Sequence, residues 1–93
     1  MTAIREEELN KINGGSMGET RMDSIYLALN GKMKEDITVA RLILDWGTSS
    51  AKVREGWDAA GVICETNFGS ANHYFADGGE ITRKQALAKL GVN

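Results

Sequence analysis

The feature that most constrains this chain is a short amphipathic run that ends in two glycines, IREEELNKINGG, at residues 4–15. Three apolar residues and one acid share one side of a helix within an arc of roughly 140°: Ile4, Glu8, Leu9 and Ile12. A helix of about eight residues is marginal in water by itself, and it folds when a partner covers its apolar side with a groove. We therefore expect this run to act as a docking helix.

The glycine pair, Gly14 and Gly15, suits the narrow cleft of a protease. Glycine has no side chain, so an enzyme's backbone and nucleophile can approach it closely, and it tolerates an extended path. A helix, a glycine pair and a longer segment form the layout of a docking tag with a cut site. The cut is expected between Gly15 and Ser16.

This stretch resembles the double-glycine leader of bacterial bacteriocin-type and pheromone-type precursors. Counted back from the cut, that family has apolar residues at −4, −7 and −12, Glu at −8 and glycines at −2 and −1. In the same order, this chain has Ile12, Leu9 and Ile4, then Glu8, then Gly14 and Gly15. The resemblance implies that the first four are recognised by the cysteine-peptidase domain of an ABC transporter. That peptidase cleaves after Gly15, and the transporter exports the cargo, a bacteriocin-like or signalling peptide.

The resemblance divides the chain into a leader at residues 1–15 and a cargo, the mature domain, at residues 16–93. The cargo is close to the size at which one hydrophobic core barely suffices. The N-terminus lacks the apolar region of a secretory signal peptide, and no run of about 20 apolar residues could span a membrane. We expect synthesis in the cytoplasm, secretion after leader cleavage by the dedicated exporter, and no stable membrane insertion.

Composition further narrows the classes of binding partner that this chain is expected to have. The net charge is −2, which argues against the basic patch of a nucleic-acid-binding protein and against a cationic membrane-disrupting peptide. Cys64 is the single cysteine, so no intrachain disulfide can form, and we expect it to be a buried small apolar residue. No Ser-His-Asp or Cys-His set can be placed. We expect no enzyme activity, cofactor, metal or small-molecule ligand, and His73 is expected to be a hairpin side chain.

Apolar spacing and stop signals predict a mostly α fold: a short leader helix, then a small helical cargo domain with a β-hairpin. Residues 16–18 are predicted as a linker before a helix at 19–29, which Asn30-Gly31 ends. Residues 36–46 are predicted as one buried element, helix or strand, with Asp36 as N-cap and Gly47 after its end. The remaining predictions are a helix after Thr48-Ser49-Ser50, hairpin arms at 62–68 and 72–76, a turn at 77–79, and a final helix that a Thr82-Gln85 capping box opens and Gly91 ends.

Two other resemblances compete with the leader. The stretch LILDWGTSSAK, residues 42–52, resembles the phosphate-binding turn of the sugar-kinase, actin and chaperone ATPase superfamily, in which Asp45 would help hold a metal. That family needs a two-lobed domain several times longer, so we interpret the match as coincidence. The order of three helices and a hairpin resembles a winged helix-turn-helix, a cytoplasmic DNA-binding regulator, with Ser49, Ser50, Lys52 and Arg54 on the third helix.

Overall fold

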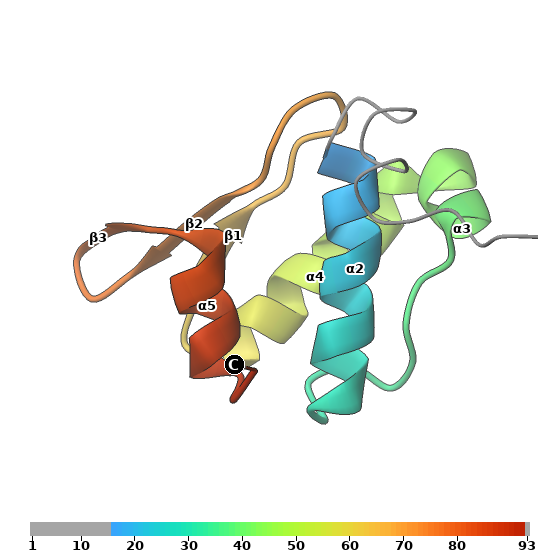
Figure 1. Cartoon of the computed structure of the whole chain (residues 1–93). Coiled ribbons are helices and arrows are strands. Elements are labelled where there is room, and N and C mark those ends of the chain that lie inside the picture. The colour runs from blue at the N-terminus through green and yellow to red at the C-terminus, as the bar shows by residue number, and fades with distance from the viewer. Residues whose placement is uncertain (1–15, 93) are drawn as a thin grey trace, which may run out of the picture.

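The computed structural model describes residues 16–92. Four helices and three strands follow one another in the order α2 (Ser16–Leu29), α3 (Val39–Leu44), α4 (Trp46–Ala59), β1 (Ile63–Glu65), β2 (His73–Ala76), β3 (Gly79–Ile81) and α5 (Arg83–Lys89). Figure 1 shows α2, α3 and α4 grouped on one side, with the sheet and α5 on the other. The predicted fold class, a mostly helical domain with a β-hairpin, is confirmed.

The core lies where α4 passes between α2 and the sheet, since α4 contacts both. Leu27 of α2, Leu42 of α3, and Val53 and Trp57 of α4 are completely buried. Val53 and Trp57 are four residues apart and therefore lie on the same side of α4. The apolar spacing along this segment correctly indicated a helix with its core side at these residues.

The ends of two helices, at Gly31 and Gly91, and the start of one, at Thr82, follow the signals in the sequence. After α2, Gly31 has a φ of 75°, and the next amide, of Lys32, donates to the carbonyl oxygen of Leu27 at 2.8 Å. This left-handed glycine closure satisfies a carbonyl that the helix leaves free. At α5, Thr82 and Gln85 form the predicted reciprocal capping box, which fixes the first turn.

The predicted linker at residues 16–18 is wrong, because these residues form the first turn of α2, with Met17 only 3 % exposed. Its small residues do not prevent a helix when the following side chains are buried. The start of α2 is therefore part of the packed domain.

The predicted single buried element at residues 36–46 is also wrong. Thr38, rather than Asp36, caps α3, and Asp45 both ends α3 and caps α4, accepting a hydrogen bond from the amide of Thr48 at 3.4 Å. A short carboxylate that binds the next helix's free N–H groups lets the chain turn there. Ile43 and Leu44 consequently face solvent, 56 % and 83 % exposed, and Gly47 lies inside α4.

The sheet is antiparallel, in the order β1-β2-β3. Cys64 pairs with Tyr74 across β1 and β2, and both are buried, so this pair forms the inner side of the hairpin. The Tyr74 ring meets the Trp57 ring of α4 edge-on, with centroids 5.3 Å apart. The predicted hairpin is confirmed with shorter strands. The predicted turn at Asp77-Gly78 is confirmed too, and it leads into β3, which the sequence analysis did not predict.

A buried carboxylate ties these elements together. Asp23 of α2 is completely buried; its oxygens accept hydrogen bonds from Arg83 at 2.9 and 3.1 Å, Tyr74 at 2.5 Å and the Trp57 indole at 3.3 Å. Burial raises the pKa of the Asp23 carboxyl, and Arg83 opposes that rise. One side chain on α2 thus holds side chains of α4, β2 and α5.

We predict that Asp23→Ala lowers the free energy of unfolding by about 3 kcal/mol or more, because it removes the buried acceptor that Arg83, Tyr74 and the Trp57 indole share. The matched control is Asp36→Ala, which removes an exposed carboxylate paired with Arg21 and should cost less than about 1 kcal/mol. Urea titration followed by circular dichroism measures both. Equal losses would contradict the role assigned to Asp23.

Candidate functional site

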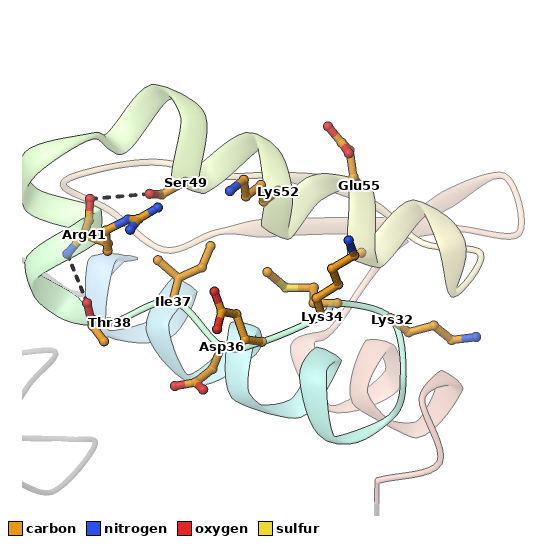
Figure 2. Close-up of a pocket in the computed structure, with 12 residues that line it drawn as sticks. Lys32, Lys34, Asp36, Ile37, Thr38, Arg41, Ser49, Lys52 and Glu55 are labelled. Carbon is orange, nitrogen blue, oxygen red and sulfur yellow. Dashed lines mark hydrogen bonds between the residues drawn. The ribbon is translucent and has the colours of Figure 1, made fainter.

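A groove of about 590 Å³ lies between α4 and the segment that joins α2 to α3. Figure 2 shows the side chains around it, with α4 along one wall and the connecting segment along the other. We call it the cationic groove, because Lys32, Lys34, Arg41 and Lys52 line it. Its acidic lining residues are Glu35, Asp36 and Glu55, and its apolar ones include Met33 and Ile37.

The wall opposite α4 is anchored to α2 by its backbone. The Ile37 amide donates to the Ser24 hydroxyl at 2.9 Å, and Arg21 donates to the Ile37 carbonyl oxygen at 3.0 Å while also pairing with Asp36. Ile37 is 7 % exposed and belongs to the core. These contacts fix the end of the segment that leads into α3, and the exposed lysines at residues 32 and 34 lie on its earlier part.

Gly56 lies at the floor of the groove, where α4 crosses α2. A Cβ atom there would stand 3.0 Å from Leu27 Cδ1 and 3.1 Å from Met33 Cγ. Although a glycine inside a helix costs stability, Gly56 allows α4 to pack closely against its neighbours.

The cations of residues 16–92 differ in their partners; Arg54 donates to the Ser50 and Thr66 hydroxyls, and Lys84 forms no ion pair within these residues. Arg21, Arg83 and Lys89 each pair with a carboxylate, of Asp36, Asp23 and Asp77 respectively. Within residues 16–92, the four cations of the groove form no ion pair, and all four are exposed. The acids that share the groove reduce its positive potential without being paired to these four side chains. The near-zero charge of the whole chain therefore hides an uneven distribution.

The start of α4 lies beside a second surface element, the loop between β1 and β2. We call residues 66–72 the wing loop. Trp46 meets Phe68 of this loop edge-on, with ring centroids 5.3 Å apart, and Arg54 donates to the Thr66 hydroxyl at 2.8 Å. These contacts hold the wing loop next to α4, so the exposed residues of the two elements lie on one surface.

The structure places the residues singled out in the sequence at different positions. Ile4, Glu8, Leu9, Ile12, Gly14 and Gly15 lie outside the described residues, and Ser16 is the first residue of α2. Ser49 and Ser50 are buried; the Ser49 hydroxyl donates to the Arg41 carbonyl oxygen at 3.4 Å. Lys52 faces the groove and Arg54 the wing loop. The sequence analysis missed Lys32, Lys34 and Arg41, because only the path of the connecting segment brings them to α4.

The remaining candidates are structural. Cys64 is buried on β1, as predicted, and burial raises the pKa of its thiol to about 12. His73 lies exposed on β2, 2.8 Å from Glu80, and this hydrogen bond raises the pKa of the imidazole. Residues 42–52 form α3 and α4 instead of a strand-turn-strand. In residues 16–92 there is no cluster of three metal-ligating side chains and no helix able to cross a bilayer.

Comparisons of the chain with protein-family models, with curated proteins and with solved structures find no match. The functional argument therefore depends on the residues and their geometry alone.

We predict opposite outcomes for the same substitution at two glycines of α4. Gly47→Ala should raise the free energy of unfolding by up to about 1 kcal/mol, because nothing lies within 4 Å of the added methyl group and alanine favours a helix. Gly56→Ala should give no gain or a loss, because its methyl group meets Leu27 and Met33. Thermal and urea unfolding of both variants checks this, and an equal gain at Gly56 would show that the packing there is loose.

Proposed function

We propose that residues 16–92 form a winged-helix domain that binds duplex DNA through α4. The observation that carries this proposal is the set of four cations that line the groove beside α4 and form no ion pair within residues 16–92, whereas Arg21, Arg83 and Lys89 are paired with acids. A cation that is not already paired with a carboxylate can neutralise a DNA phosphate, and the DNA then releases condensed counterions. Arg41 lies at the end of the groove where α3 meets α4, Lys32 lies at the opposite end, and Lys34 and Lys52 lie between them (Figure 2).

The arrangement of elements supports the same function. Helices α2, α3 and α4 contact one another, and α3 leads into α4 through Asp45 alone, as one helix of a helix-turn-helix leads into the recognition helix. The antiparallel hairpin follows, and its wing loop lies beside the start of α4. A recognition helix and a wing on one surface is the arrangement that a winged helix needs.

The exposed side of α4 suits close approach to a groove of DNA. Its first turns carry the small residues Gly47, Thr48 and Ala51 ahead of Lys52. Small side chains let a helix backbone come near base edges. A threonine can contact a base through its hydroxyl group or through its methyl group. Binding through phosphates is expected to depend strongly on salt, and the acids Glu35 and Glu55 at the same groove are expected to weaken it.

We predict that Arg41→Ala and Lys52→Ala each weaken binding to a duplex and lower the slope of log affinity against log salt by about 1. The matched control is Lys84→Ala, an exposed lysine on α5, across the domain in Figure 1. Fluorescence anisotropy with a labelled random duplex at several salt concentrations measures the slopes. Absent or salt-independent binding, or an equal effect of Lys84→Ala, would contradict the proposal.

A second candidate function rests on the spacing in residues 4–15, which is that of a double-glycine leader. In this proposal the chain is an exported precursor, and the peptidase of an ABC transporter cuts after Gly15. The described part adds one constraint: Met17 is 3 % exposed and Thr20 is completely buried, close behind the cut. The peptidase would therefore act before the first turn of α2 has packed.

For this candidate we predict that co-expression with a double-glycine-type ABC transporter releases a product that begins at Ser16. Gly14→Val should abolish the cut, since a branched side chain does not fit the cleft, and Leu9→Ala and Ile12→Ala should each weaken docking by roughly 1–3 kcal/mol. Intact mass of the secreted material is the measurement, with a known substrate of the transporter as the control. An uncut chain in the cells, beside a processed control, removes this candidate.

A further inference from the structure

We propose that the N-terminal run, residues 4–12, packs its apolar side onto an apolar patch of the same chain. The patch consists of Ile43, Leu44, Trp46 and Phe68, and we call it the junction patch because it lies where α3 meets α4 and the wing loop. This proposal does not depend on DNA binding. It assigns the patch an occupant of known sequence.

The junction patch is the main exposed apolar surface at this end of the described domain. Leu44 is 83 % exposed, Ile43 56 % and Phe68 50 %, and Trp46 contacts Phe68. Leu44 precedes the cap residue of α4, and Trp46 follows it, so the aliphatic and aromatic residues are two positions apart in the chain. A grouping of large apolar side chains in solvent is a mark of a docking surface.

The described chain begins beside this patch. In the first turn of α2, the Glu19 carboxylate accepts a hydrogen bond from the Asn72 amide at 3.1 Å, which ties α2 to the wing loop. Asn72 in turn accepts from the Asn67 amide at 3.2 Å, and Asn67 precedes Phe68. Figure 1 likewise shows the start of α2 next to the loop between β1 and β2. With residues 9–12 in a helix at about 1.5 Å per residue and the four steps from Ile12 to Ser16 extended, the chain from Leu9 to Ser16 can span up to about 18 Å.

The run matches the patch in size, polarity and charge. Its Leu9 and Ile12 are three residues apart and share one helix side with Ile4, an apolar side that needs cover to be stable. Its three acids, residues 6–8, meet a rim that carries Arg41, which is three residues before Leu44 on α3 and forms no ion pair within residues 16–92. Gly14 and Gly15 provide the turn that folding back requires.

The test is disulfide trapping in the full chain. In a Cys64→Ala background, Leu9→Cys is combined with Leu44→Cys, and the matched control combines Asn10→Cys, on the opposite side of the run, with the same Leu44→Cys. Leu44 is 83 % exposed, so its substitution leaves the core intact. We expect the Leu9 pair to form an intramolecular disulfide at least ~10-fold faster than the control under mild oxidation, because docking raises the effective thiol concentration.

A second measurement separates docking from a chance collision. Leu44→Asp should remove amide hydrogen-exchange protection from residues 4–12, whereas Leu29→Asp, at an equally exposed leucine (77 %) at the end of α2, should leave it unchanged. Equal trapping rates for the two cysteine pairs would overturn the proposal. A disulfide-linked dimer as the main product would also overturn it, because a second copy would then cover the patch.

Discussion

The buried carboxylate of Asp23 is the interaction that the rest of this domain depends on. It lies on α2, yet its hydrogen-bond partners belong to α4, β2 and α5. A buried charge is costly unless its partners are complete, and here the partners come from elements far apart in the sequence. The carboxylate thus specifies how the sheet and α5 sit against the three helices.

That arrangement determines which surfaces remain open. With α4 held between α2 and the sheet, its outer side faces the segment before α3, where the cationic groove forms, and its start faces the wing loop. Three cations are paired with acids, while the four that line the groove form no ion pair within residues 16–92. The proposed functional surface therefore consists of cations that the folded domain does not pair with its own acids.

Local signals predicted the local features: the helix ends at Gly31 and Gly91, the capping box at Thr82 and the hairpin. They failed at residues 36–46, because an apolar run does not show that Asp45 will bind the amides of a new helix and divide the run. They also failed for the groove. Lys32 and Lys34 were not predicted as site residues, because their proximity to α4 depends on the path of the segment between α2 and α3, which no spacing in the sequence reveals.

The most direct test of the account is an NMR titration of the ¹⁵N-labelled full chain with a short DNA duplex at low salt. The account predicts that amide shifts concentrate at α3, at the first half of α4 and in the wing loop, residues 66–72, and that added salt reverses them. Shifts concentrated on α5 or β3, or none at all while the domain stays folded, would contradict the assignment of α4 and its cationic groove as the nucleic-acid interface.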